Sequence, residues 1–268
     1  MKACKLFRAG DRPVLVDEDA ALTPLCSGDE REDRQFGKGL HKEIAALQEM
    51  LYAEHQRKVL LVLQGVDCAG KDGTVHQLFR KINPMGLRPV RFDVPTVAET
   101  ARDFLWRVHL QVPRKGEIAV FNRSHYEDVL HPIVYDRIDG PEAGRRYAQI
   151  RDFERTLAES GTTIVKVFLH ISKDEQRRRL QDRIDDPEKH WKFDPEDLTH
   201  REKWSEYHAA YEKAIAETDA AHAPWYIVPA DSKPHRDIAV AALLAETMRG
   251  MSLAFPAGDP KLAKLRVK

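Results

Sequence analysis

The sequence has few cysteines and no arrangement that would pair them. Cys4, Cys26 and Cys68 are its only three, and no two of them form a CxxC pair. Disulfide frameworks and thiolate metal sites need paired or clustered cysteines. We therefore expect a reducing, cytoplasmic setting.

Long apolar runs are also missing. The longest aliphatic run is Val59 to Leu63, whereas a membrane-spanning helix needs about 20 apolar residues. The first residues carry Lys2, Lys5 and Arg8 but no apolar stretch, which is not the pattern of a signal peptide. We expect neither a membrane span nor a secretion signal.

Neither sign of charge is in excess. The chain has 43 Lys and Arg against 43 Asp and Glu, so its formal net charge is zero. No general basic field exists that would hold nucleic acid or an anionic membrane surface, and we expect neither as a partner. A site for a polyanion must come from a local concentration of Arg and Lys.

The chain does contain a regular alternation of apolar patterns. Five strands are predicted, at residues 58–64, 90–94, 117–121, 162–171 and 225–228. Six helices are predicted, at residues 40–51, 74–81, 145–159, 173–184, 199–218 and 234–249. Continuous apolar strands that alternate with helices indicate an α/β fold whose parallel sheet is covered on both faces.

The same patterns suggest one domain with attachments. Residues 1–37 are polar and contain a charge run at 29–34, so we expect an N-terminal arm or loosely packed lead-in. Residues 38–249 form the expected domain, with a lid at about 172–198. Residues 250–268 are expected to be a basic, unstructured C-terminal tail.

A glycine-rich loop follows the first predicted strand. Residues 65–71 are Gly-Val-Asp-Cys-Ala-Gly-Lys, which satisfies GxxxxGK between a strand and a helix. In such a loop the backbone amides and the positive end of the helix bind phosphate, and the lysine supplies a mobile cation. The residues expected to bind phosphate here are Gly65, Ala69, Gly70, Lys71, Asp72, Gly73 and Thr74.

This loop carries unusual carboxylates. Asp72 replaces the usual magnesium-binding Ser or Thr after the lysine, and Asp67 lies inside the loop. Phosphates would repel Asp67 unless a cation lay between them, so Asp67 is a candidate Mg²⁺ ligand or a group that aligns a phosphoryl acceptor. The alternative is a turn-forming aspartate that bonds its own backbone.

The strand at 117–121 is followed by more polar residues. Asn122 offers a carbonyl oxygen without charge, and Glu127 with Asp128 could supply the missing charge. With Asp67, these three are the candidate metal ligands, although Glu127 and Asp128 could simply be favourable charges at a helix start. We expect Arg123 at the mouth of the site, where a guanidinium can bridge phosphate oxygens.

The segment after the strand at 162–171 has the position of a kinase lid. From Lys173 to Lys192 it carries seven Lys or Arg and six Asp or Glu, so most of these charges are expected to be structural. A lid arginine would cover the phosphates and exclude water. We expect Arg178 and Arg183 to point inward, more than Arg177 or Arg179.

Together these residues resemble the polyphosphate kinase 2 family. The resemblance covers roughly residues 38–240. It is carried by residues 65–73, Asn83-Pro84, Pro95-Thr96, residues 104–107, residues 121–130, residues 170–173 and Trp191-Lys192-Phe193. Asn122 followed by Glu127-Asp128 is similar to the family's class III.

The resemblance implies a three-layer α/β/α P-loop kinase fold with a helical lid. It also implies transfer of a phosphoryl group from inorganic polyphosphate to AMP and ADP, giving ADP and ATP, with Mg²⁺ as cofactor and a homo-oligomeric assembly. Carried over by position, Asp67 and Lys71 are the loop residues, Arg123 follows the second acidic position and Arg183 is the lid arginine. Asn122 stands where other classes have Asp, and Asp128 with Glu127 is expected to take over that role.

Polyphosphate offers only anionic groups, so cations and N–H donors must hold it. Lys71, Arg123, Arg178 and Arg183, with Lys81 as a further candidate, could line its channel. Mg²⁺ held by Asp67 and Asp128 would offset the repulsion between donor and acceptor. Two alternatives remain: an ATP-dependent nucleoside or nucleotide monophosphate kinase, and a non-catalytic P-loop nucleotide switch.

Overall fold

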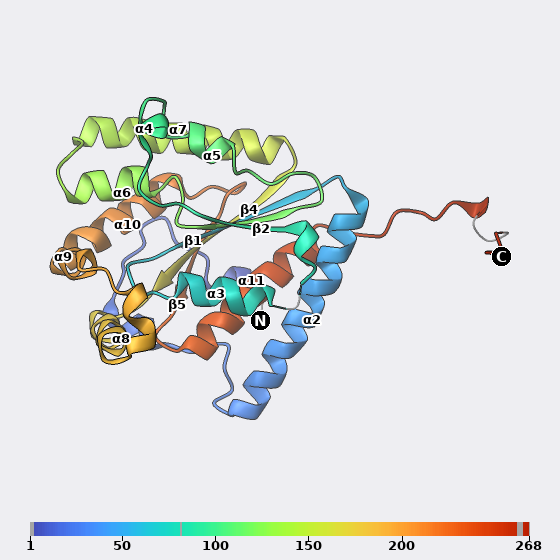
Figure 1. Ribbon diagram of the computed structural model, residues 1–268, viewed down its shortest axis with the longest axis horizontal. Coiled ribbons are helices and arrows are strands. Elements are labelled where there is room, and N and C mark those ends of the chain that lie inside the picture. Colours follow the sequence, from blue (N-terminus) through green and yellow to red (C-terminus); the bar gives the residue numbers. More distant parts are fainter. Residues whose placement is uncertain (1–2, 81, 262–264, 268) are drawn as a thin grey trace.

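The fold is built on one five-stranded sheet (Figure 1). The computed structural model describes residues 3–80, 82–261 and 265–267. All neighbouring strands are parallel. Their order across the sheet is β2 (Leu87–Arg91), β3 (Ile118–Asn122), β1 (Lys58–Gln64), β4 (Thr162–His170) and β5 (Trp225–Pro229). The predicted parallel α/β sheet is confirmed.

Helices cover both faces of the sheet, which makes three layers (Figure 1). One face carries α2 (Glu30–Glu54), α3 (Lys71–Phe79) and α11 (Lys233–Gly250). The other carries α6 (Glu127–Val134), α7 (Gly140–Glu159) and α10 (Trp204–Thr218). Alternate residues of β1 divide between them: Leu61 packs into the first layer and Leu60 into the second. Both faces of β1 are therefore buried, as its continuous apolar run indicates.

The lid and several short elements complete the chain. The lid consists of α8 (Lys173–Asp185) and the 3₁₀ helix η3 (Pro187–Lys192), and α9 (Glu196–Glu202) follows it. The short elements are α1 (Ala3–Leu6), η1 (Asp17–Ala21), η2 (Pro84–Gly86), α4 (Val97–Thr100) and α5 (Trp106–His109). Among the described residues, no helix has both the length and the hydrophobicity needed to cross a membrane.

Several predicted boundaries are wrong: α2 begins at Glu30 rather than at residue 40, and α7 at Gly140 rather than at residue 145. Two further differences have identifiable reasons. The strand expected at 90–94 spans 87–91 and is only half-buried, because it lies at the edge of the sheet, where Pro89 is tolerated. The helix expected at 199–218 is two helices, because Lys203 leaves helical geometry between α9 and α10. No proline or glycine lies at this break, so the sequence pattern alone gives no sign of it.

The N-terminal segment is packed rather than loose. Phe7 is buried, its carbonyl accepts a hydrogen bond from Ile227 N (2.9 Å), and Ala9 N donates to Trp225 O (3.0 Å). This segment therefore covers the outer edge of β5, an edge that proteins usually protect. The expected charge run forms the start of α2, where the side chain of Asp29 caps the backbone of Arg31 and Glu32. The helix thus begins inside the arm that we expected to end at residue 37.

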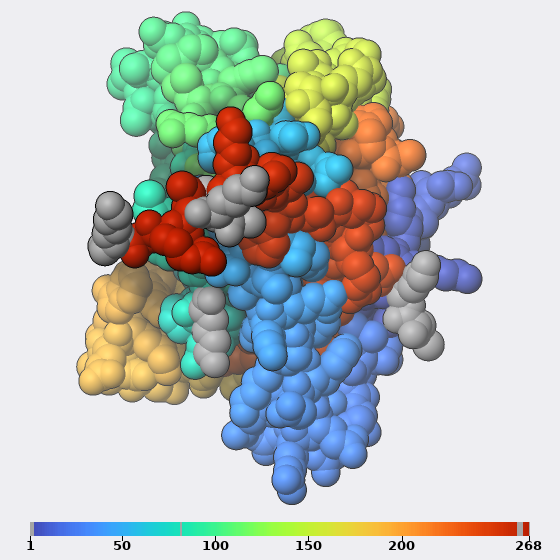
Figure 2. All heavy atoms as spheres, turned by 90° about the vertical axis from the view of Figure 1, so that its right-hand side faces the viewer, coloured from blue at the N-terminus to red at the C-terminus, as the bar shows by residue number. Residues whose placement is uncertain are grey.

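The opposite terminus leaves the body of the protein. Residues 253–259 contain no helix or strand, and the chain runs away from the three layers there (Figure 1). Figure 2 looks onto the face where α2, in blue, and the red C-terminal part lie side by side, consistent with the packing of α2 against α11.

A fully buried polar network supports the layer that contains α6. Lys166 on β4 donates to Glu154 Oε2 (2.6 Å) and to Thr218 O (2.8 Å), and Tyr126 donates to Glu154 Oε1 (2.9 Å). Tyr126 is the residue that precedes α6. The network therefore fixes the start of the helix that carries Glu127 and Asp128.

Candidate active site

A cleft of about 760 Å³ opens at the carboxyl end of the sheet. Its walls come from the loop after β1, the segment after β2, α6, and the helices that follow the lid. Ligand sites of parallel α/β sheets form at this edge, beyond the carboxyl ends of the strands. The glycine-rich loop lies where a phosphate would meet the start of α3.

The loop conformation depends on its glycines. Gly70 has φ +101°, and a Cβ there would overlap the guanidinium of Arg236, a buried residue of α11. The hydroxyl of Thr74 donates to Gly70 O (3.1 Å) and ties the first turn of α3 to the loop. The amides of this turn are thereby held in the orientation that phosphate binding requires.

Lys71 is buried at the first position of α3. Its Nζ donates to Gly65 O (2.5 Å) and Val66 O (3.2 Å), so the ammonium group lies inside the curve of the loop. Burial, together with the charge of Arg123, lowers the pKa of Lys71, while the charge of Asp67 opposes this effect.

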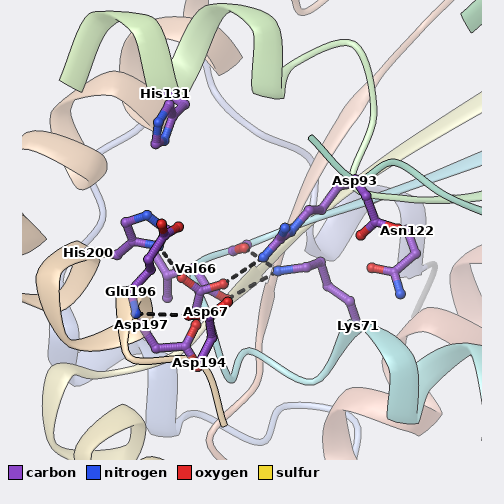
Figure 3. A network of polar contacts seen from close by, with 12 residues as sticks. Val66, Asp67, Lys71, Asp93, Asn122, His131, Asp194, Glu196, Asp197 and His200 are labelled. Carbon is purple, nitrogen blue, oxygen red and sulfur yellow. Dashed lines mark hydrogen bonds and ion pairs between the residues drawn. The ribbon is translucent and has the colours of Figure 1, made fainter. Parts of the chain in front are cut away.

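Asp67 lies between cationic groups of different elements (Figure 3). Its Oδ1 accepts from Arg123 Nη2 (2.9 Å) and its Oδ2 from His200 Nδ1 (2.8 Å). Burial alone would raise the pKa of Asp67, but the His200 hydrogen bond and the charges of Lys71 and Arg123 hold it well below its usual range. Asp67 is therefore an ionised carboxylate facing the cleft, and its partners are not those of a turn-forming aspartate.

Glu127 and Asp128 line the same cleft from the first turn of α6. Asp128 Oδ2 accepts from Arg107 Nη2 (3.1 Å), and Arg107 also donates to Asp93 O (2.8 Å). Burial raises the pKa of both carboxyls, although Arg123 counteracts the effect on Glu127 and Arg107 that on Asp128. Both carboxyls would be stabilised in their charged form by an additional cation.

Asn122 takes a different position from the other candidate ligands. Its side-chain amide donates to Asp72 Oδ1, and it is not among the residues that line the cleft. The predicted set of four metal ligands is therefore divided: Asp67, Glu127 and Asp128 line one cleft, whereas Asn122 and Asp72 form a separate pair. The ligand role of each remains a prediction.

The donor set of the cleft suits a hard cation that also binds phosphate. Mg²⁺ is usually held by one or two carboxylates and by substrate phosphates rather than by a cage of protein ligands. Burial raises the pKa of Glu127, although the charges of Arg123 and Lys71 oppose this effect. His, Cys, Asp and Glu side chains can all bind metal ions. Among the described residues, one group of three of them has its ligand atoms all within 4.8 Å of each other: Asp67, Asp197 and His200.

The lid arginines correct one prediction. Arg178 is half-exposed and pairs with Glu175 and Asp182 of its own helix, so its predicted inward orientation is wrong. Arg179 is the buried one. It donates to Cys68 O (2.9 Å) and Ala69 O (3.2 Å) in the loop.

Arg183 is placed by the helix that follows the lid. Its Nη1 donates to Asp197 Oδ2 (3.1 Å) and Lys192 O (2.9 Å), and its side chain is one quarter exposed. Burial and the charge of Asp67 raise the pKa of Asp197 to about 6. Lys81, the remaining phosphate-binding candidate, lies outside the described residues.

Four residues of the site were missed by the sequence analysis. Asp197 and His200 lie on α9, Arg107 on α5 and Arg236 on α11. None of them belongs to a spacing motif, and each reaches the loop or α6 only through the tertiary fold. The one available sign was Arg107, which lies within a segment that carries the family resemblance.

The family model of polyphosphate kinase 2 matches residues 27–256. This range includes the loop, the cleft and the lid. The chain belongs to the polyphosphate kinase 2 family.

Similar proteins cover most of the chain. The AMP/ADP-polyphosphate phosphotransferase of Meiothermus ruber is 52% identical over 229 residues, which are 85% of this chain and 86% of that protein. The ADP-polyphosphate phosphotransferase of Rhodopseudomonas palustris is 42% identical over 83% of this chain and 81% of its own. The crystal structure of polyphosphate kinase 2 from Arthrobacter aurescens TC1 superimposes with a TM-score of 0.95, at 41% identity, covering 98% of this chain and 95% of that one.

Proposed function

We propose that this polyphosphate kinase 2 family member transfers the terminal phosphoryl group of inorganic polyphosphate to AMP and to ADP, forming ADP and ATP. The observation that carries the proposal is the cleft itself. Asp67, an ionised carboxylate, and the guanidinium of Arg123 line this cleft, and the ammonium group of Lys71 lies inside the curve of the glycine-rich loop. The family match and the names of the similar proteins support the choice of donor and acceptor.

In the reaction, an oxygen of the acceptor's terminal phosphate attacks the terminal phosphorus of the donor chain. The bond from that phosphorus to the bridging oxygen breaks, and its electron pair stays on the shortened chain. The attacking oxygen is already ionised near neutral pH, so no strong general base is required. Lys71, Arg123 and the loop amides would hold the transferring oxygens in line, as in other phosphoryl transfers.

Asp67, with Glu127 or Asp128, would hold Mg²⁺ beside the phosphates, and the ion would reduce the repulsion between two anions. Arg107 bonds Asp128 and Arg123 bonds Asp67, and these hydrogen bonds orient the two carboxylates. Arg183, which Asp197 holds in place, is the lid arginine that we propose to contact the phosphates.

We further propose a cytoplasmic, homo-oligomeric enzyme. Size-exclusion chromatography with light scattering tests the assembly.

The test is product analysis with Mg²⁺, polyphosphate and either AMP or ADP, separated by ion-exchange chromatography. We expect ADP and then ATP from AMP, and ATP from ADP. Lys71→Ala should lower turnover at least about 100-fold, because it removes a charge that stabilises the transition state. Lys115→Ala, an exposed lysine in the loop before β3, is the matched control.

Two outcomes would overturn the proposal. A folded sample that forms no product with either acceptor would exclude polyphosphate as donor. Product formed from ATP and AMP or a nucleoside, with no polyphosphate present and none formed from polyphosphate, would identify an ATP-dependent nucleotide kinase instead.

A further inference from the structure

The cleft has two chemically different halves. One half holds the charged groups around Asp67. The other is a wall of four rings, formed by His131, Tyr135, His200 and Tyr207, which all line the cleft and are all half-buried. These four residues are called the ring wall below.

The rings of this wall contact one another. The ring centroids of His131 and Tyr135 are 4.5 Å apart, those of His131 and His200 5.7 Å, and those of His200 and Tyr207 5.6 Å. Tyr207 Oη lies 3.1 Å from His131 Nδ1. The rings of His131 and His200, and those of His200 and Tyr207, meet edge to face, so the wall consists of rings that support one another rather than of one flat surface.

Inorganic polyphosphate has no group that would bind to aromatic rings. The donor consists of phosphate units alone and has no planar or apolar face to place against a ring. Of the two substrates in the proposed reaction, only the acceptor carries an aromatic group, its base. Bases stack on aromatic side chains with about 1–3 kcal/mol per base.

We propose that the ring wall is the stacking platform for the base of the acceptor nucleotide, with Tyr135 as its principal residue, and that the acceptor's phosphates point to Asp67 and Arg123. This inference rests on the proposed function and deepens it. Tyr135 is the least buried of the four rings. His200 connects the two halves, because its Nδ1 bonds Asp67 while its ring lies 6.1 Å from that of Tyr135.

Two cations lie over the Tyr135 ring and would have to yield to a base. Arg137 Cζ is 5.7 Å and Lys203 Nζ is 5.3 Å from the ring centroid. An exposed cation–π contact contributes about 0.5–1 kcal/mol. Base stacking contributes at least as much as one such contact, so a base can replace one of the two side chains on the ring.

The orientation follows from this placement. With the base on the ring wall, the acceptor phosphate reaches the loop from the side of α6 and α9. The donor chain must then approach the same phosphorus from the other side of the loop, since an in-line transfer places donor and acceptor on opposite sides.

The test combines truncation of the ligand with truncation of the residue. Titration calorimetry measures binding of AMP and of ribose 5-phosphate, which lacks the base, to the full-length protein. We expect Tyr135→Ala to weaken AMP binding at least about fivefold, the lower end of the stacking range, and to leave ribose 5-phosphate binding within about twofold. Tyr135→Phe should bind AMP as the native protein does.

Tyr135→Leu serves if the alanine variant does not fold, because it keeps side-chain volume without a ring. Phe36→Ala, which removes an exposed ring on α2, is the matched control. In steady-state kinetics, the KM for AMP should rise while the KM for polyphosphate stays unchanged.

Equal weakening of AMP and ribose 5-phosphate, or no weakening of either, would overturn the ring-wall assignment. Native protein that forms no ADP from polyphosphate would overturn the proposed function instead. The binding ratio of AMP to ribose 5-phosphate is measured without turnover, so the two failures can be told apart.

Discussion

His200 and Asp67 hold one another across the cleft, with Nδ1 of the histidine 2.8 Å from Oδ2 of the aspartate. The two residues are 133 positions apart in the chain. On the same short helix, Asp197 bonds Arg183 of the lid. One element of seven residues, α9, therefore connects the lid to the phosphate loop.

Removing the His200 ring should disturb Asp67 without unfolding the protein. We expect His200→Ala to lower kcat at least about tenfold, because Asp67 loses the hydrogen bond that fixes its orientation. His200→Asn, whose amide can donate in place of Nδ1, should recover part of this loss. Initial rates across a Mg²⁺ series measure both variants, with His222→Ala, an exposed histidine, as control. Equal rates in the alanine variant and the native protein would exclude a positioning role.

Asp128→Asn tests whether the carboxylate of α6 takes part in catalysis. We expect turnover to fall at least about 100-fold, since the change removes a charge proposed to hold Mg²⁺. Asp152→Asn, on the exposed side of α7, is the matched control. Near-native turnover of Asp128→Asn would assign the metal role to Glu127.

The buried pair of Lys166 and Glu154 should be important for stability. Both side chains are fully buried, so Lys166→Met leaves the carboxylate of Glu154 buried without its lysine partner and should cost about 3–5 kcal/mol of unfolding free energy. Urea denaturation at pH 7 measures the loss. Lys166→Met combined with Glu154→Gln should restore part of it, and the exposed Lys213→Met should stay within about 0.5 kcal/mol. A single variant as stable as the native protein contradicts this prediction.

Stability should fall in mild acid because of His208. Burial, and secondly the nearby His170, lower the pKa of His208 to about 4, whereas an unfolded histidine titrates near about 6.5. Between these pH values, His208 binds a proton in the unfolded chain but not in the folded one. The unfolding free energy is therefore unaffected by His208 above about pH 6.5 and decreases as the pH falls toward 4. From pH 7 to pH 5 this group should remove about 1–2 kcal/mol of unfolding free energy.

The check is urea unfolding at both pH values. His208→Gln should show a smaller loss between pH 7 and pH 5 than the native protein. His222→Gln should show the same loss as the native protein. An unchanged pH dependence in His208→Gln would show that other groups cause the acid sensitivity.

The sequence was informative wherever local pattern determines structure. The apolar run of β1 and the glycines around Lys71 predict the position of the loop correctly. A buried strand requires consecutive apolar residues and a left-handed turn favours glycine, so both can be recognised in the sequence. The lid helix was also located, since it begins within a residue of where its charges and spacing predict.

Which side chains of that helix face inward could not be predicted. Arg178 and Arg179 are adjacent, and only the packing of α8 against the loop makes the second one the buried residue. The same holds for His200 and Asp197, which reach Asp67 and Arg183 only because α9 breaks from α10 at Lys203. Contacts of this kind, between residues far apart in the chain, produce no periodic pattern in a single sequence.

Four of the five hydrogen bonds of Arg179 join the lid helix α8 to other parts of the chain. Besides the two loop carbonyls, its guanidinium bonds Ala230 O (2.6 Å) and Asp231 O (2.8 Å) beyond β5. Bonds to a charged donor contribute about 1.5–3 kcal/mol each, so Arg179, in the middle of α8, anchors this helix to the loop and to the segment after β5. A lid movement that keeps these bonds is confined to the residues after Arg179, which include Arg183.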